Sequence, residues 1–340
     1  DRNFEFSVEH VALAKQADVV MIAPASANVI GKIAHGIADD MLTTTVMACR
    51  CKKILAPAMN TNMYENPILQ DNLDICRRYG MEVITPAWGY LACGDTGAGK
   101  MPEPEVLYEY ILREAGYPGD LAGRRILVTA GPTRESIDPV RYITNHSTGK
   151  MGYAIARVAA YRGADVTLVS GPVDLPRPLF VETVPVESAR EMFEAVTARS
   201  GEQDIIVKAA AVADYRPATV GTEKIKKSDG DLSIALERTN DILAWLGQNR
   251  RDGQFLCGFS METQNMLENS RAKLAKKHID MIVANNLKVE GAGFGTDTNV
   301  VTLITRDSET ELPIMTKEEV ADCLLTEILK RTKEQDGIQG

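Results

Sequence analysis

Short apolar runs alternate along this chain with longer segments of helical spacing, and this alternation limits the folds open to it. The first run lies in residues 18–25, and an unbroken apolar run of this length is typical of a strand buried on both faces. Further strands are expected at 53–58, 81–86, 125–129, 165–169, 204–209, 254–259, 279–284 and 299–305. Helical spacing is found at 28–38, 70–79, 103–115, 148–162 and 316–333. The alternation predicts parallel sheets covered by helices.

A stretch rich in glycine and proline, 116–123, separates two such α/β series. A chain of 340 residues is long enough for two domains that each bury their own core. We therefore predict an α/β fold of two Rossmann-like, doubly wound domains, at 1–115 and 124–335, joined by a linker at 116–123. The chain begins with Asp1 and soon enters a buried-type strand, so we expect the first domain to lack its N-terminal part.

The formal net charge is −9, and no block of lysine and arginine is present. This balance argues against nucleic-acid binding. No apolar run reaches the roughly 18 residues that a membrane span needs, and no signal peptide is visible. The six cysteines lack the paired spacing of a zinc site, which favours free thiols in a reducing compartment. We therefore expect neither nucleic-acid binding nor a membrane span, and a reducing compartment.

One motif, Asn145-His-Ser-Thr-Gly-Lys-Met-Gly152, stands where a helix is expected to begin. Free backbone N–H groups and the positive end of the helix dipole make such a start a possible phosphate site. The alternative is an ordinary helix start capped by Ser147 or Thr148. The spacing alone leaves both interpretations open.

Two further segments each allow a functional and a structural interpretation. Lys208-Ala-Ala-Ala-Val-Ala-Asp-Tyr-Arg216 follows a strand, where small residues allow either a flat ligand or a helix to approach closely. Glu223-Lys-Ile-Lys-Lys227 is either solvated surface or a set of cations that neutralises a triphosphate.

These segments, with 138–152 as a whole and Gly258-Phe-Ser-Met-Glu-Thr263, resemble the phosphopantothenate–cysteine ligase family in order and spacing. The resemblance covers about 122–333. It implies that CTP activates the carboxylate of 4'-phosphopantothenate as an acyl-cytidylate, and that cysteine then displaces CMP. Mg²⁺ is expected to bridge the phosphates.

The resemblance also implies roles for single residues. Asn145 would hold the acyl-cytidylate, Arg141 would serve the attack by cysteine, and Lys224 would act on the triphosphate. The remaining residues implied for CTP binding are Ser147, Gly149, Ala210, Ala211, Asp214, Asn240, Asp241, Ile242, Phe259, Lys273 and Lys277.

In the first domain His10, Asn60 and Cys93 are each ambiguous, because a lone histidine or cysteine is more often structural than catalytic. Their surroundings resemble the flavin-dependent phosphopantothenoylcysteine decarboxylases. The matching blocks are Ala23-Pro-Ala-Ser-Ala-Asn28, Ala34-His-Gly-Ile-Ala-Asp-Asp40, Pro57-Ala-Met-Asn60 and Ala92-Cys-Gly-Asp95.

This second resemblance implies FMN as cofactor, with Ser26, Ala27 and Asn28 along the flavin or the substrate. His10 would be the acid/base of the oxidation, Asn60 would bind the substrate carboxylate, and Cys93 would protonate the decarboxylated product. The first strand and its phosphate loop are absent, so we expect a chain that starts at Asp1 to bind FMN weakly.

Together the two resemblances imply a bifunctional enzyme of coenzyme A synthesis. They also imply a cytoplasmic location, small-molecule substrates and a homo-oligomer. An NAD(P)-dependent oxidoreductase is disfavoured, because no G-x-G-x-x-G loop is followed by an acidic residue at the required spacing. A non-catalytic relative of the same fold is disfavoured, because the chemical residues of both halves are intact.

Overall fold

The computed structural model divides the chain into two compact units, Asp1–Pro118 and Gly119–Gly340. It describes residues 9–226, 232–261, 266–285, 293, 295–335 and 337. The start of the chain at Asp1, residue Lys227 of the predicted lysine segment and residues 262–263 of the ligase motif lie outside the described residues.

The first unit is built on a parallel sheet with the strand order β1-β2-β3. Its strands are β1 (Val19–Ala25), β2 (Lys52–Pro57) and β3 (Glu82–Val83), and an antiparallel hairpin is formed by β4 (Ala87–Tyr90) and β5 (Thr96–Lys100). Its helices are α1 (Glu9–Gln16), α2 (Ala27–Ala34), α3 (Met41–Ala48), α4 (Thr61–Tyr64), α5 (Pro67–Arg78), α6 (Pro104–Ile111) and the π-helical turn η1 (Leu112–Gly116).

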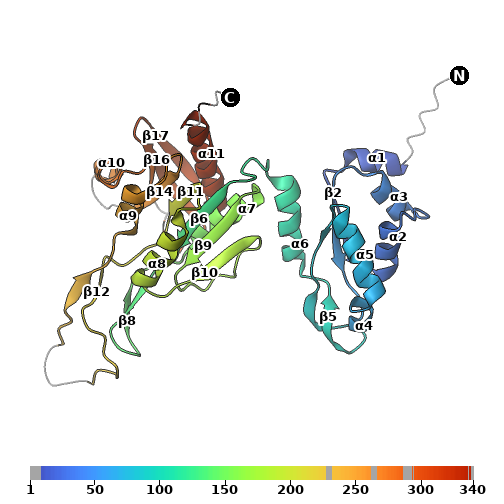
Figure 1. Cartoon of the computed structure of the whole chain (residues 1–340), viewed down its shortest axis with the longest axis horizontal. Helices are drawn as coiled ribbons and strands as arrows, with labels where there is room; N and C mark the ends of the chain where they lie inside the picture. The colour runs from blue at the N-terminus through green and yellow to red at the C-terminus, as the bar shows by residue number, and fades with distance from the viewer. Residues whose placement is uncertain are drawn as a thin grey trace. The chain divides into compact units, whose positions relative to one another are not determined.

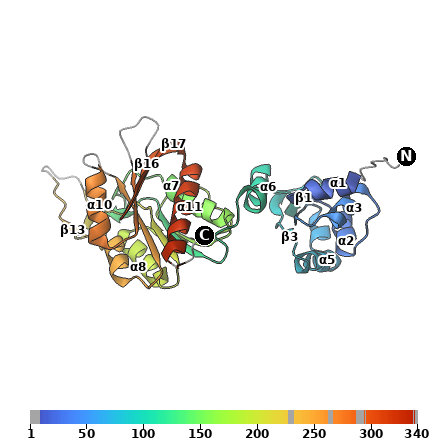
Figure 2. The same cartoon turned by 90° about the horizontal axis from the view of Figure 1, so that it is seen from above.

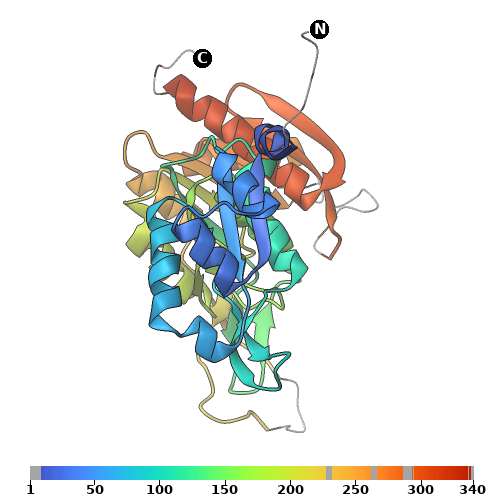
Figure 3. The same ribbon diagram turned by 90° about the vertical axis from the view of Figure 1, so that its right-hand side faces the viewer.

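Alternate residues of the strands lie on opposite faces of this sheet, and helices cover both faces. Ile22 and Leu55 pack with α2, α3 and α5, whereas Ile54 packs with Leu107 of α6. Figure 3 shows the blue strands of this unit lying between helices on both sides. This arrangement directs the carboxyl ends of β1 and β2 to one edge, where Ser26 and Asn60 follow.

The second unit contains an eight-stranded sheet with the order β10-β9-β6-β11-β14-β15-β16-β17. The first six strands in this order are parallel, and β16 and β17 add an antiparallel edge. The bounds are β6 (Arg125–Ala130), β9 (Asp165–Ser170), β10 (Val181–Pro185), β11 (Ile205–Lys208), β14 (Phe255–Met261), β15 (Met281–Asn285), β16 (Thr298–Thr305) and β17 (Glu309–Thr316). In chain order the parallel part follows the Rossmann pattern 3-2-1-4-5-6. The order reverses between β6 and β11, where such sheets bind ligands.

Helices cover both faces of this sheet, as Figure 2 shows. They are α7 (Lys150–Tyr161), α8 (Ala189–Ser200), α9 (Ile242–Asn249), α10 (Met266–Lys277) and α11 (Lys317–Gln335). On one face Met192 of α8 and Leu246 of α9 pack against strand residues such as Leu127 and Leu256, all of which are fully buried. On the other face α7 and α11 lie side by side.

Four short strands form an arm that extends away from the main sheet (Figure 1). β7 (Arg134–Ser136) pairs with β8 (Tyr142–Thr144), and β12 (Tyr215–Pro217) pairs with β13 (Leu236–Arg238). β7 and β12 are in contact, so the two pairs support each other. The arm carries both Arg141 and Lys224.

The predicted α/β class with two units built on parallel strands is confirmed. The expected strand at 81–86 is shorter, at Glu82–Val83. Several elements were not predicted, notably α3, α8, α9 and the antiparallel strand β17. β17 was missed because only Leu312 in it is buried, which leaves no continuous apolar run. In the part of the chain that the structure describes, no helix is both long and apolar enough to cross a membrane.

Candidate functional site

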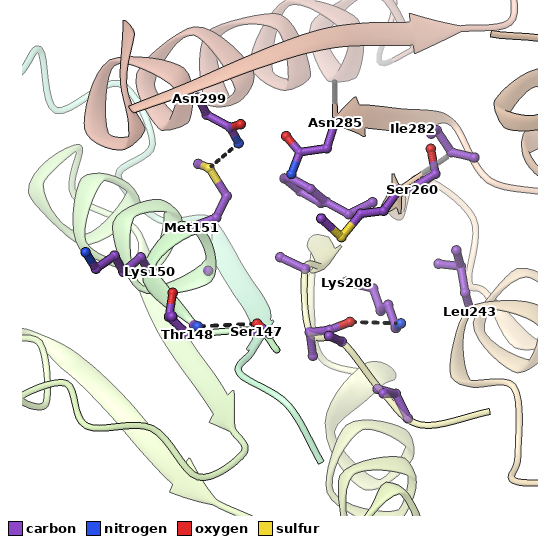
Figure 4. Close-up of a pocket in the computed structure, with 18 of the residues that line it drawn as sticks. Ser147, Thr148, Lys150, Met151, Lys208, Leu243, Ser260, Ile282, Asn285 and Asn299 are labelled. Atoms are coloured by element: carbon purple, nitrogen blue, oxygen red, sulfur yellow. Dashed lines mark hydrogen bonds between the residues drawn. The ribbon is translucent and has the colours of Figure 1, made fainter. Parts of the chain in front are cut away.

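A cavity of about 280 Å³ opens at the carboxyl ends of the central strands of the second unit, where the strand order reverses (Figure 4). Its walls come from the start of α7, the ends of β11, β14 and β15, and helix α10. Eight of the predicted CTP-binding residues line it: Ser147, Gly149, Ala210, Ala211, Asp214, Phe259, Lys273 and Lys277. The fold therefore brings together segments that are up to 130 residues apart in the sequence.

The start of α7 forms one wall of the cavity without a side-chain cap. Gly149 takes the N-cap position with φ at 79°, and neither Ser147 nor Thr148 caps the helix. Ser147 Oγ instead accepts a hydrogen bond from Gly149 N at 3.3 Å. The simple capped start, one of the two interpretations of this motif, is therefore wrong. The first N–H groups of α7 face the cavity and suit an anion.

The end of β11 forms the opposite wall, and small residues bring its backbone close to the loop after β6. A bridge pairs Pro132 with Ala211, and Ala210 N donates to Thr129 Oγ1 at 3.1 Å. Asn145 Nδ2 donates to Ala211 O at 2.9 Å, so the asparagine predicted to hold the intermediate lies at the junction of the two walls. Asn145 itself lines a neighbouring hollow that shares Ser147, Thr148 and Lys150 with the cavity.

Three lysines supply positive charge to the β11–α10 side of the cavity. Burial lowers the pKa of Lys208 to about 8, and the nearby Lys277 adds to this effect. Lys208 Nζ donates to Ala210 O at 3.0 Å, as Figure 4 shows. Lys277 pairs with Asp241 at 3.0 Å, and Lys273 completes the set. Lys208 was not singled out from the sequence, although it begins the quoted Lys208–Arg216 segment.

The far end of the cavity is polar and comes from β15, β16 and α11. Its residues Asn285, Asn299 and Lys317 are 8%, 1% and 4% exposed, respectively, and none was predicted as a site residue. Among the described residues no hydrogen-bond partner reaches Asn285 Oδ1. Lys317 Nζ donates to Gly293 O at 3.0 Å. The sequence carried no signal for Asn299 and Lys317, because β16 and α11 reach the site only through the antiparallel edge of the sheet. Asn285 directly follows the expected strand at 279–284, and this position at a strand end could have pointed to it.

Three predicted residues at the start of α9 do not line the cavity. Asp241 caps α9 by accepting from Ala244 N at 3.0 Å, and Ile242 is a core residue with 2% exposure. Asn240 lines a separate hollow with Arg216 and Arg238. Only Asp241 reaches the cavity lysines, through its ion pair with Lys277.

The arm holds the two cationic residues predicted for the two chemical steps. Arg141 pairs with the buried Asp138 at 2.5 Å, and its guanidinium also donates to Ile225 O at 3.0 Å. Lys224, the residue before Ile225, is exposed and does not line the cavity. The structure thus places the Arg141 side chain against the backbone that carries Lys224.

In the first unit a second group of predicted residues lies at the carboxyl end of β2. Asn60 Nδ2 donates to Cys93 Sγ and to Asp95 Oδ2, both at 3.3 Å. The Cys93 thiol donates to the same Asp95 oxygen at 3.5 Å. Asp95 was noted only as part of a sequence block, yet it joins the two predicted catalytic side chains.

The other predicted residues of this unit follow β1 or belong to α1. Ser26 caps α2 by accepting from Val29 N at 3.3 Å, and Ala27 and Asn28 form the first turn. His10 lies at the start of α1, half-buried. The hydrogen bonds of the Asn60–Cys93–Asp95 group do not include His10.

Within the described residues no group of three or more histidine, cysteine, aspartate or glutamate side chains could hold a metal ion. All six cysteines are free thiols. Burial raises the pKa of Cys257 far above its usual range, whereas Cys93 is exposed. Exposure therefore separates the predicted catalytic cysteine from the buried cysteines, which are chemically inert.

Comparison with known proteins assigns each unit to a family. Residues 1–116 match the Flavoprotein family, and residues 121–332 match the family described as DNA/pantothenate metabolism flavoprotein C-terminal domain. The coenzyme A biosynthesis bifunctional protein CoaBC of Bacillus subtilis is 48% identical over 333 residues, which cover 96% of this chain and 81% of that protein. A cysteine/cysteine sulfinic acid decarboxylase from an unknown prokaryotic organism is 44% identical, over 94% of this chain and 91% of that protein. The crystal structure of a C-terminal domain of CoaBC superposes with a TM-score of 0.55 at 47% identity and covers 64% of this chain and 100% of that domain.

Proposed function

This chain belongs to the family of bifunctional coenzyme A biosynthesis proteins, and on that basis we propose how its residues divide the chemistry. It is an enzyme of coenzyme A biosynthesis that ligates phosphopantothenate with cysteine and decarboxylates the product. The ligation belongs to the second unit and the decarboxylation to the first. We propose CTP as the nucleotide that drives the ligation.

The observation that carries the ligase proposal is the cavity between α7 and β11. The start of α7, which has no side-chain cap, and the lysines Lys208, Lys273 and Lys277 line one cavity of about 280 Å³. Such an arrangement suits a polyphosphate, because fixed dipoles and cations stabilise the charge that develops on phosphorus. In the first step a substrate carboxylate oxygen bonds to the α-phosphorus of CTP, and the bond to pyrophosphate breaks.

In the second step the amine of cysteine bonds to the acyl carbon, and CMP leaves with the electron pair of the broken C–O bond. Asn145 lies at the junction of the two walls and is placed to donate to the acyl-cytidylate, once its side chain releases Ala211 O. We assign Lys224 to the first step and Arg141 to the second. Mg²⁺ would be held mainly by phosphate oxygens, because it prefers oxygen ligands. Asp214 lines the cavity and would supply a carboxylate oxygen as a further ligand.

For the decarboxylase we propose that Cys93, Asn60 and Asp95 form the chemical group. An exposed thiol that donates to a carboxylate is placed to give a proton to the carbon left by CO₂. Asn60 already donates to a carboxylate oxygen in this structure, so it can donate to the carboxylate of the substrate.

FMN would be held at the edge formed by the ends of β1 and β2, where the start of α2 offers small and polar residues. Ser26, Ala27 and Asn28 would hold it there. When bound, FMN supplies the oxidation of the cysteinyl thiol that makes loss of CO₂ easy. His10, as acid/base of that oxidation, stays a prediction.

We further propose a cytoplasmic homo-oligomer that binds no nucleic acid. The free thiols and the net charge of −9 support this setting. The similarity to a cysteine decarboxylase suggests free cysteine as an alternative decarboxylation substrate. The ligase cavity favours the phosphopantothenoyl compound, because the second unit can make it.

The test of the ligase is pyrophosphate release from CTP and from ATP in the presence of 4'-phosphopantothenate. We expect pyrophosphate release with CTP. Lys224→Ala should lower the rate of this release about a hundredfold or more, since a single charge-stabilising group commonly contributes this much. Lys276→Ala is the matched control, because Lys276 is an exposed lysine of α10 outside the cavity lining. Absence of release with either nucleotide would overturn the ligase assignment, and release with ATP alone would overturn the choice of CTP.

A further inference from the structure

We propose that Asp138 is a positioning residue of the ligation, which fixes the backbone that carries Lys224 and joins it to Arg141. This inference rests on the proposed function, because it assigns Asp138 to the step in which Lys224 acts. Asp138 is the first residue of the 138–152 motif, but the resemblance assigns it no role and it does not line the cavity. It is singled out by its burial and by the direction of its hydrogen bonds.

Asp138 is 2% exposed, although it lies in a loop of the arm. A buried carboxylate is costly unless it is paired and hydrogen-bonded. Here its Oδ1 accepts from Val140 N and Arg141 N, both at 2.9 Å. Its Oδ2 accepts from the Arg141 guanidinium at 2.5 and 3.1 Å. These partners hold the pKa of Asp138 well below its usual range, so it stays charged at neutral pH.

The same oxygen also contacts the lysine segment, which lies 87 residues further along the chain. Ile225 N donates to Asp138 Oδ2 at 3.1 Å, while Arg141 donates to Ile225 O at 3.0 Å. Asp138 and Arg141 therefore hold both polar groups of one peptide residue. A contact with an N–H and a C=O together fixes the direction of the backbone as well as its position.

We call the two hydrogen bonds that join Asp138 and Arg141 to Ile225 the clamp. The residues around the clamp support a role in positioning rather than in general stability. Gly221 N donates to Ile137 O at 2.9 Å, which fixes the segment a second time, four residues before Ile225. Lys224 lies between these two attachments, and its side chain is exposed. The segment is thus fixed by its backbone, while the lysine side chain remains available to a ligand.

This geometry makes the residues proposed for the two steps interdependent. Arg141, assigned to the attack by cysteine, also helps to hold the segment of Lys224, which is assigned to activation. Loss of Asp138 should therefore impair the first step even though Asp138 contacts no cavity residue. Loss of Arg141 should impair the first step less, because Asp138 would still accept from Ile225 N.

The test compares Asp138→Asn with Glu237→Gln in the full chain. Glu237 is a matched control, since it pairs with Arg216 at 2.8 Å on the same arm but is half-exposed and outside the clamp. We expect Asp138→Asn to lower kcat for pyrophosphate release about tenfold or more and to change the Kd of CTP less than twofold. Trypsin should cleave after Lys224 faster in Asp138→Asn than in the control.

Ile225→Pro provides a second variant in case Asp138→Asn folds poorly. It removes the N–H that donates to Asp138 and leaves the Asp138–Arg141 pair in place, so it should show the same fall in kcat. Because trypsin does not cleave a Lys–Pro bond, the gain in cleavage is measured after Lys226 in this variant and compared with cleavage at the same bond of the unaltered chain. Unchanged release together with unchanged cleavage in both variants would overturn the positioning role. If the unaltered chain released no pyrophosphate, the proposed function would fail, and the cleavage comparison would still decide whether Asp138 fixes the segment.

Discussion

Lys208 shows how a residue acquires a special chemistry from its place in the fold. In sequence it is one lysine at the end of an apolar strand, where a charged residue usually marks the surface. In the structure Lys208 is half-buried and its ammonium group donates to Ala210 O. Desolvation, with the nearby Lys277, lowers its pKa to about 8. A lysine with this pKa is charged at neutral pH and loses its charge just above it.

This shift predicts that CTP binding weakens as the pH rises through about 8. A phosphate binds the charged lysine better than the neutral one, so the Kd of CTP should increase by up to about tenfold between about pH 7 and about pH 9. Isothermal titration calorimetry at several pH values measures this change.

The matched variant is Lys208→Arg, because arginine stays charged throughout this range. It should bind CTP with little dependence on pH, whereas Lys208→Met should bind weakly at every pH. An unaltered chain whose Kd is constant across the range would show that Lys208 does not contact the nucleotide phosphates.

At the scale of elements, the β4–β5 hairpin depends on close backbone approach. Met59 N donates to Gly99 O at 3.0 Å, and a Cβ on Gly99 would lie 2.1 Å from Met59 O. Gly99 also has φ at 137°, which side chains rarely adopt. The hairpin carries Cys93 and Asp95 in its turn, so this contact sets their distance from Asn60.

Gly99→Ala should therefore separate Cys93 from Asn60 and lower the rate of CO₂ release about tenfold or more. Gly89→Ala is the matched control on the partner strand, because its Cβ would meet only the Lys100 side chain at an ordinary 3.5 Å. CO₂ release, FMN absorbance and pyrophosphate release are measured together. Equal CO₂ release from the two variants would contradict the role of the hairpin, and pyrophosphate release should be the same in both.

At the scale of the molecule, the second unit includes residues that the sequence pattern suggested as linker. Arg162 is 1% exposed, and it pairs with Asp120 at 2.7 Å and with Asp322 at 3.0 Å. Leu121 is fully buried, and its N–H donates to Arg162 O. Asp120 and Leu121 thus form part of the folded second unit.

A chain of residues 119–340 should consequently be more stable than one of residues 124–340. Removal of a charged partner from a buried arginine and of a buried leucine should lower the free energy of unfolding by at least about 2 kcal/mol. Urea denaturation measures the difference, and Asp120→Asn in the longer chain isolates the contribution of the ion pair. Both chains should release pyrophosphate, since the cavity lies outside the deleted residues; equal stability would contradict the packing role of 120–121.

Local sequence patterns were enough to predict the α/β class, the two series of strands and helices, and the motifs that form most of the cavity. They were enough because strand and helix periodicities and glycine-rich helix starts depend on neighbouring residues. Contacts between distant segments were decided only by the tertiary structure. The burial of Lys208, the polar end formed by Asn285 and Asn299, and the clamp of Asp138 on Ile225 all depend on which strands become neighbours. Local pattern does not contain that information, since desolvation and hydrogen-bond geometry arise only when the segments pack together.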